Sequence, residues 1–292
     1  MEIRTNSAHA WLLAARPKTL TGAAVPVLVA LCAAWSSVPQ DFDWLPALLC
    51  MAFALLMQVD ANLVNDYFDW ADGVDTAERL GPERAVAQGW VTPRAMRIAI
   101  VLTTLASAAT GLPLVMWGGW YLVWIGMACI AGCFLYTTLF SRHALGDVLV
   151  FLFFGIVPVC ATYYIQRHEL TTNVVMLATA CGMVVDCLLI INNYRDRETD
   201  ARVGKATLAT LIGATPTEAI YLAIGFVATG LTIPALGTEV VLMLPYLALH
   251  TTNWRQMHRI HKGRALNKVL ATTSMAILLF GLSLSILLLL QL

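Results

Sequence analysis

Residues 98–141 read IAIVLTTLASAATGLPLVMWGGWYLVWIGMACIAGCFLYTTLFS and contain no Asp, Glu, Lys or Arg over 44 residues. As a single helix this stretch would be about 66 Å long, twice the roughly 30 Å hydrocarbon core of a bilayer. It therefore predicts two membrane spans. The break is expected at Trp117-Gly118-Gly119-Trp120, because glycine permits a tight turn and tryptophan prefers the membrane interface.

The rest of the chain has the same character. Of its 292 residues, 59% are hydrophobic and 12% are charged, against a charged share of about 25% in soluble domains. This composition excludes a soluble globular protein. We expect an all-α polytopic membrane protein, in which residues 1–292 form one transmembrane domain with about nine spans. The expected spans are 19–36, 44–64, 97–116, 120–140, 147–165, 172–192, 217–236, 239–254 and 269–290.

The basic residues are distributed asymmetrically between the two sides of this topology. With the N-terminus inside, 17 of the 18 Lys and Arg residues fall on the inner side and only Arg167 falls outside. Cytoplasmic loops carry such an excess of Lys and Arg. We therefore expect a multi-pass protein of the bacterial inner membrane, with a cytoplasmic N-terminus and an external C-terminus.

Two polar segments repeat one pattern at the inner ends of spans two and six. The first reads Asn65-Asp66-Tyr67-Phe68-Asp69, and the second, offset by 127 residues, reads Asn192-Asn193-Tyr194-Arg195-Asp196 and continues to Asp200. Because four spans separate them, they predict two parallel four-helix repeats plus one helix, arranged around a central cavity. Both Asp-rich segments would then lie at the cytoplasmic end of that cavity.

The carboxylates in these segments are spaced for metal binding. Asp66 and Asp69 are three apart and Asp196 and Asp200 four apart, so each pair would share one face if its helix continued for another turn. Mg²⁺ prefers one or two carboxylates together with water and substrate phosphates. We predict that these four residues are the metal-ligating and catalytic residues. The basic neighbours that would hold the remaining phosphate oxygens are Arg79, Arg84, Arg195, Arg202 and Lys205.

Other kinds of segment fit the two Asp-rich sequences less well. A solvated acidic loop is the simplest alternative, although its recurrence at equivalent positions disfavours it. An EF-hand does not fit, since the alternate-residue spacing and the closing Glu are missing, and no phosphate-binding glycine loop occurs. A secondary transporter would place its charged residues at mid-membrane rather than at one interface.

Some polar residues lie inside the predicted spans. Gln58, Asn62, Asn65 and Asp69 recur at steps of four, three and four, so they form a stripe that we expect to face the cavity. Asp60 and Asp186 lie off this stripe, and we expect each to pair with a neighbouring helix or to be neutral, without a catalytic role. The roles of Asp72 and Asp75 stay open. The aromatic and polar candidates for the rest of the cavity wall are Tyr136, Tyr163, Tyr164 and Gln166, although an aromatic residue near a helix end is more often an interface anchor.

At these motifs the sequence resembles the UbiA superfamily of intramembrane prenyltransferases, over nearly the whole chain. The superfamily pattern is Asn-Asp-x-x-Asp after helix two and Asp-x-x-x-Asp after helix six, which here correspond to 65–69 and 196–200. Further features resemble the branch that prenylates a naphthoate: Arg16-Pro17-Lys18 before helix one, and Gly73 where many members carry Asp.

The resemblance implies an activity and its participants. It implies Mg²⁺-dependent transfer of a polyprenyl group from polyprenyl diphosphate to 1,4-dihydroxy-2-naphthoate, an aromatic acid, with loss of CO₂ to give demethylmenaquinol. Other acceptors that the same fold would suit are 4-hydroxybenzoate, homogentisate and heme. Arg16 and Lys18 are candidates for the ring carboxylate, although a topogenic role fits them equally. The residues expected to contact substrate are Arg16, Lys18, Asn62, Asn65, Arg84, Asn192, Asn193, Arg195, Arg202 and Lys205.

Overall fold

The computed structural model describes residues 3–73, 80–140 and 143–291. Across these ranges the chain forms helices and no β-strand, as the composition predicted. The helices are α1 (Ala8–Ala15), η1 (Pro17–Thr19), α2 (Leu20–Ser37), η2 (Pro39–Asp41), α3 (Trp44–Ala71), α4 (Pro93–Gly111), η3 (Leu112–Leu114), α5 (Val115–Gly118), α6 (Tyr121–Thr138), α7 (Gly146–Phe151), η5 (Leu152–Ile156), α8 (Val157–Arg167), α9 (Thr172–Arg202), α10 (Leu208–Ile212), α11 (Ala214–Leu231), α12 (Ile233–Leu236), η6 (Gly237–Met243), α13 (Leu244–Ile260) and α14 (Leu266–Leu290).

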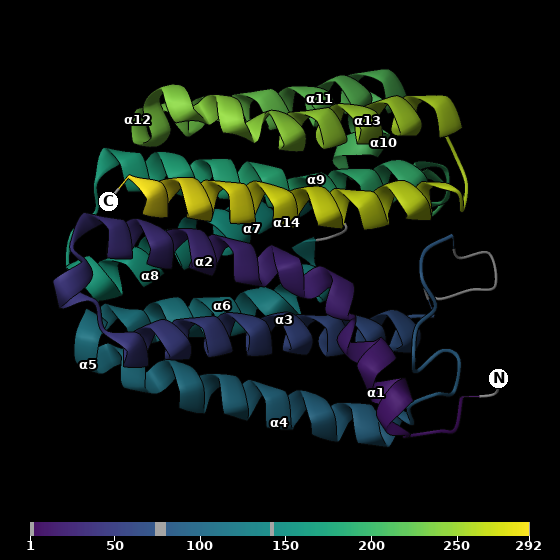
Figure 1. The fold of residues 1–292 in the computed structure, drawn as a ribbon. Coiled ribbons are helices and arrows are strands. Elements are labelled where there is room, and N and C mark those ends of the chain that lie inside the picture. The colour runs from purple at the N-terminus through teal and green to yellow at the C-terminus, as the bar shows by residue number, and fades with distance from the viewer. Residues whose placement is uncertain (1–2, 74–79, 141–142, 292) are drawn as a thin grey trace.

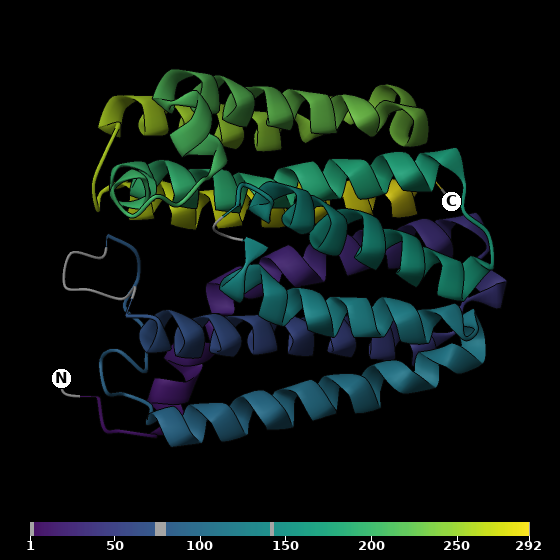
Figure 2. The same cartoon turned by 180° about the vertical axis from the view of Figure 1, so that it is seen from behind.

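The long helices lie roughly parallel or antiparallel in one bundle (Figure 1). The pair α11 and α13 forms one side of the bundle and α4 the opposite side, with α9, α14, α2 and α3 between them. The N-terminus lies at the end of the bundle where α3 and α9 end, whereas the C-terminus lies at the other end, and the view from behind agrees (Figure 2). Both Asp-rich segments therefore share one end of the molecule.

The 44-residue apolar run is divided where the sequence predicted. Helix α5 ends at Gly118, Gly119 has a φ of 84°, and α6 begins at Tyr121. Such a positive φ is strained for any residue with a Cβ atom, so glycine is the residue suited to this turn.

The number of membrane spans differs from the expected nine in one region. Among the described residues, eight segments are long and apolar enough to cross a membrane, and one of them, Ala214–Ile260, has 47 residues. Within it α11 and α13 pack against each other, joined by α12 and η6. The segment thus turns back on itself. Its second arm, α13, has 17 residues, fewer than the about 20 that a membrane-spanning helix needs. The count of nine is not confirmed.

Helices α3 and α9 extend beyond their apolar parts and carry the polar motifs. They have 28 and 31 residues, so both continue through the motif by at least one turn, as the carboxylate spacing required. The buried Asp60 on α3 accepts hydrogen bonds from Thr103 and Thr104 on α4, at 2.6 and 2.8 Å. It joins two helices away from the motif.

The position of α9 is fixed by a close backbone approach. A Cβ atom on Gly155, in the π-helical turn η5, would lie 2.4 Å from the Cα atom of Gly182 on α9. Small residues allow helix backbones to approach in this way inside membranes. Helix α9, which carries the second Asp-rich segment, is also part of the largest buried apolar cluster.

Candidate active site

A cavity of about 990 Å³ lies between the two Asp-rich segments and the bundle interior. Much of its wall is apolar, with Phe53, Met57, Ile130, Phe153 and Leu189 among the lining residues. One end is polar, and its lining residues there include Arg16, Lys18, Asn65, Arg84, Asn192 and Asn267. The cavity therefore suits an amphiphile with a long apolar part and a charged end.

The polar stripe on α3 faces this cavity, as predicted for three of its four members. Gln58, Asn62 and Asn65 line the cavity, and Asn62 donates to the Thr19 hydroxyl and the Ala15 carbonyl, both at 2.9 Å. The fourth member, Asp69, lies beyond the cavity lining.

The two carboxylates of the first motif have different partners. Asp66 is 1% exposed, and its two oxygens accept the backbone N–H groups of Ala85 and Val86, each at 2.9 Å. Its contacts show that Asp66 holds the segment after α3 against the helix. Asp69 remains 19% exposed and forms an ion pair with Arg84 at 2.5 Å.

Arg84 and Arg16 organise the polar end around Asn65. Arg84 is 6% exposed and donates to the side-chain oxygen of Asn65 as well as to Asp69. Arg16 follows α1 in a left-handed conformation with φ of 50°. This turn brings its guanidinium to 3.5 Å from the Asn65 oxygen and 3.7 Å from Asp66. Two cations thus lie at the same polar end, where they favour a bound anion.

The second motif is organised by Arg195, which is 3% exposed. Its guanidinium binds Asp196 through two hydrogen bonds of 2.6 and 2.8 Å, and it also donates to Asn192 at 2.7 Å. Lys205, three residues after the end of α9, lies 3.3 Å from Oδ2 of Asp200. These contacts show that Arg195 orders the motif, and its contact with phosphate stays a prediction.

Asn267, at the start of α14, was missed by the sequence reasoning. Its side-chain oxygen accepts from Arg195 at 2.8 Å, and its amide nitrogen donates to the carbonyl of Leu80 at 2.8 Å. It therefore connects the second motif to the segment that follows the first. The only sequence signal is a polar residue in the first turn of an apolar helix, next to the cluster of Lys and Arg before it.

Only some of the residues predicted to contact substrate line the cavity. Arg16, Lys18, Asn62, Asn65, Arg84 and Asn192 line the cavity. Asn193 is buried and Arg202 exposed, and neither lines the cavity. Asp75 and Arg79 lie outside the described residues.

The candidates for the rest of the wall are also divided. Tyr136 lines the cavity as predicted. The predictions for Tyr163, Tyr164 and Gln166 were wrong, because these residues are not among its lining residues. Gln166 instead makes two hydrogen bonds to the backbone of Asp43, at 3.0 and 2.8 Å. Gln166, near the end of α8, thus holds the turn between α2 and α3.

The donor set at this end fits Mg²⁺. The described residues contain no group of three or more His, Cys, Asp or Glu side chains placed to hold a metal ion. Mg²⁺ does not require such a cage, because it binds through one or two carboxylates and takes its other ligands from water and phosphate. Oδ2 of Asp200 is buried and has Lys205 as its cationic neighbour at 3.3 Å. As a carboxylate oxygen it is a hard ligand of the kind that Mg²⁺ prefers.

The apolar helices, the cavity with one polar end and the paired polar segments together define the class of a helical integral-membrane protein with an internal cavity. The model of the UbiA prenyltransferase family matches residues 23–280, so the chain belongs to that family. It is 35% identical over 281 residues to a 1,4-dihydroxy-2-naphthoate octaprenyltransferase of Mycobacterium tuberculosis, covering 94% of each chain. It is 33% identical over 280 residues to the protein of the same name from Mycobacterium leprae, again covering 94% of each.

Solved structures share the fold. A UbiA homolog from Aeropyrum pernix matches with a TM-score of 0.68 and 17% identity, over 91% of this chain and 96% of that one. A UbiA homolog from Archaeoglobus fulgidus bound to GPP and Mg²⁺ matches with a TM-score of 0.66 and 13% identity, over 96% and 99% of the two chains.

Proposed function

We propose that this protein transfers a polyprenyl group from polyprenyl diphosphate to 1,4-dihydroxy-2-naphthoate, with decarboxylation to demethylmenaquinol. The observation that carries the proposal is the cavity of about 990 Å³, whose apolar wall leads to a polar end bordered by both Asp-rich segments. Relatives that cover 94% of the chain and bear the corresponding name support this choice of acceptor.

The diphosphate would lie at the polar end of the cavity. Asp66, Asp69, Asp196 and Asp200 are the proposed ligands of Mg²⁺, which when bound would neutralise charge on the leaving group. Asp69 and Asp196 keep exposed fractions of 19 and 23%, so they can reach a bound ion directly. Asp66 would have to do so through the lone pairs that Ala85 and Val86 leave free. Arg84, Arg195, Arg202 and Lys205 are the proposed partners of the remaining phosphate oxygens.

The reaction balances without an added proton donor. The allylic C–O bond breaks and its electron pair leaves with the diphosphate, while a ring carbon forms the new C–C bond. The bond to CO₂ then breaks and returns its electron pair to the ring, so the prenyl group replaces the carboxyl group. The apolar wall excludes water from the allylic cation, and Arg16 and Lys18 at the cavity mouth are the proposed partners of the ring carboxylate.

A direct assay tests this function. The purified protein in lipid would be incubated with Mg²⁺, labelled polyprenyl diphosphates of several lengths, and separate ring acids. We expect prenylated product and equimolar CO₂ with 1,4-dihydroxy-2-naphthoate, and no turnover after chelation of Mg²⁺. Transfer to 4-hydroxybenzoate or homogentisate with the naphthoate inert would refute the proposed acceptor. A protein that transfers to no acceptor would refute the function.

A further inference from the structure

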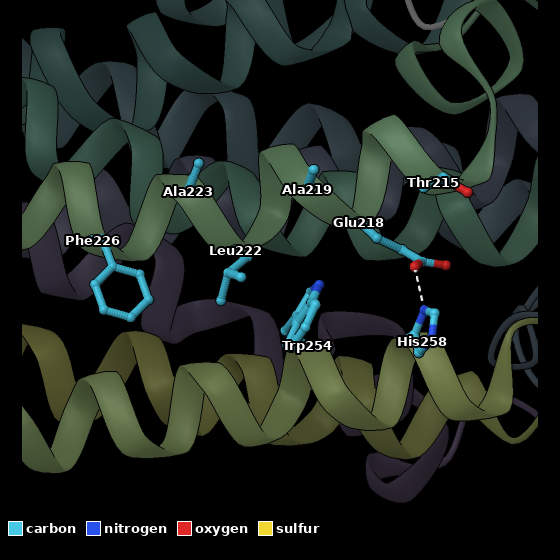
Figure 3. A pocket seen from close by; sticks show the side chains of 8 residues that line it. All are labelled: Thr215, Glu218, Ala219, Leu222, Ala223, Phe226, Trp254 and His258. Atoms are coloured by element: carbon cyan, nitrogen blue, oxygen red, sulfur yellow. Dashed lines mark hydrogen bonds and ion pairs between the residues drawn. The ribbon is translucent and has the colours of Figure 1, made fainter.

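A buried carboxylate outside the cavity connects three helices. Glu218 on α11 is 4% exposed, and one of its oxygens accepts a hydrogen bond from the hydroxyl of Tyr194 on α9. The other oxygen lies 2.7 Å from Nδ1 of His258 on α13 (Figure 3). His261 completes the cluster, with its Nδ1 3.6 Å from Glu218 and 3.1 Å from the Tyr194 hydroxyl.

This cluster lies beside a groove of about 410 Å³ between α11 and α13, separate from the cavity. Figure 3 shows Glu218 directed from α11 toward His258 at the end of the groove, with Trp254 one turn before His258. A buried carboxylate is costly unless it is paired and hydrogen-bonded. Glu218 has such partners, because Tyr194 donates a hydrogen bond to it and His258 and His261 lie beside it.

Tyr194 lies inside the second Asp-rich segment and is fully buried. The guanidinium of Arg197 covers its ring at 4.3 Å and donates to its carbonyl at 2.7 Å. The next residue, Arg195, turns about 100° away around the helix and holds Asp196 and Asn267. The clamped residue Tyr194 is thus the direct neighbour of Arg195, which holds Asp196 and the cavity-lining Asn267.

We propose that Glu218 is a positioning residue for the diphosphate site, acting through Tyr194 on the Asp196–Asp200 pair. The inference rests on the proposed function, since it assumes that this pair holds Mg²⁺ against the diphosphate. Without the clamp α9 keeps its apolar packing but gains rotational freedom at its last two turns. The metal-binding oxygens are then less ordered, and the binding of diphosphate weakens while the ring acid is bound as before.

The test measures the binding of inorganic diphosphate with Mg²⁺ to the full-length protein in detergent by titration calorimetry. Losing a hydrogen bond to a charged group predicts about a tenfold rise in the Kd for diphosphate in Glu218→Ala and in Tyr194→Phe. The double variant should show little further rise in Kd, because both substitutions break the same Tyr194–Glu218 hydrogen bond. Glu218→Gln, which keeps the shape and one acceptor, should stay within about threefold of the wild type.

The matched control is Asp60→Ala, which removes another buried carboxylate that two hydroxyls hold across a helix pair. It should lower stability and leave the Kd for diphosphate unchanged. In turnover assays Glu218→Ala and Tyr194→Phe should raise the KM for polyprenyl diphosphate about tenfold and leave that for the ring acid within twofold. All values are taken on the monodisperse, folded fraction, and Tyr194→Phe keeps the core filled if Glu218→Ala misfolds.

The outcomes separate this inference from the proposed function. If the wild type binds no diphosphate with Mg²⁺, the proposed function fails. If the wild type binds and Tyr194→Phe binds equally well, the positioning role is refuted. A rise in the KM values for both substrates together, or a matching loss in Asp60→Ala, would also refute it, because these are effects of general destabilisation.

Discussion

Asp66 and Asp69 lie three residues apart on α3, yet their partners differ in kind. Asp69 pairs with a side chain, that of Arg84, whereas Asp66 is held by two backbone N–H groups. The sequence predicted the identity of these carboxylates from their repetition. It could not predict their partners, because those depend on how residues 80–92 fold back over α3.

Three of the four carboxylates should be sensitive mainly to loss of charge. Asp69→Asn, Asp196→Asn and Asp200→Asn each remove a charge from the proposed metal site while keeping the side-chain shape. Each should lower turnover by a factor of about 10²–10³. The reason is that the charge on the leaving group grows toward the transition state, where the contact with bound Mg²⁺ matters most. Raised Mg²⁺ should restore part of the activity. The prenyl-transfer rate, measured across a Mg²⁺ series, checks this, and full activity in any of the three would contradict it.

Asp66→Asn should behave differently. The amide offers one oxygen where two backbone donors need acceptors, so a buried N–H of Ala85 or Val86 loses its partner. We expect a loss of activity together with a fall of about 1–3 kcal/mol in the free energy of unfolding. Excess Mg²⁺ should restore little. Protease sensitivity of residues 80–92 reports the released segment, and recovery of activity by Mg²⁺ alone would show that Asp66 acts only as a ligand.

At the scale of elements, most helices followed from the apolar runs. The break at Gly119 and the continuation of α3 and α9 through their motifs were predicted and are confirmed. The eighth predicted span, 239–254, was displaced, because Gly237–Met243 forms a 3₁₀ turn and α13 runs from Leu244 to Ile260. The residues of this turn are mostly apolar, so hydropathy does not distinguish them from the helix that follows. The start of α13 could therefore not be predicted from the sequence.

The contact of η5 with α9 predicts an intolerant glycine. In Gly155→Ala the added methyl group would lie 2.4 Å from the backbone of Gly182, which cannot move aside. Overpacking of this kind should lower the free energy of unfolding by about 1–3 kcal/mol. Gly230→Ala on α11 is the control, since its Cβ meets nothing within 4 Å and alanine favours a helix. Thermal melting of both variants tests this, and equal Tm values would contradict the packing described.

At the scale of the whole molecule, the structure places both Asp-rich segments and the N-terminus at one end (Figure 1). The Lys and Arg distribution predicts that this end is cytoplasmic. Single cysteines introduced at Arg202 and at Trp120 should therefore react with an impermeant reagent from opposite sides of the membrane. Labelling of both positions from the same side would contradict the topology.

Arg167 tests the same arrangement through activity. Arg167 is the last residue of α8, at the end of the bundle opposite to both motifs. One membrane thickness of roughly 30 Å therefore separates it from the proposed diphosphate site. Arg167→Ala should keep turnover within about twofold of the wild type, once rates are normalised to protein amount. A hundredfold loss would mean that the site is misplaced.

The bond from Asn267 to Leu80 has a consequence for biosynthesis. Asn267 belongs to α14, the final helix, which also packs against α2, the first long one. During translation Arg195 therefore lacks its Asn267 partner until α14 has been synthesised. A nascent chain without α14 has only the contacts of Arg195 with Asp196 and Asn192, so the proposed diphosphate site acquires this cross-connection late in synthesis.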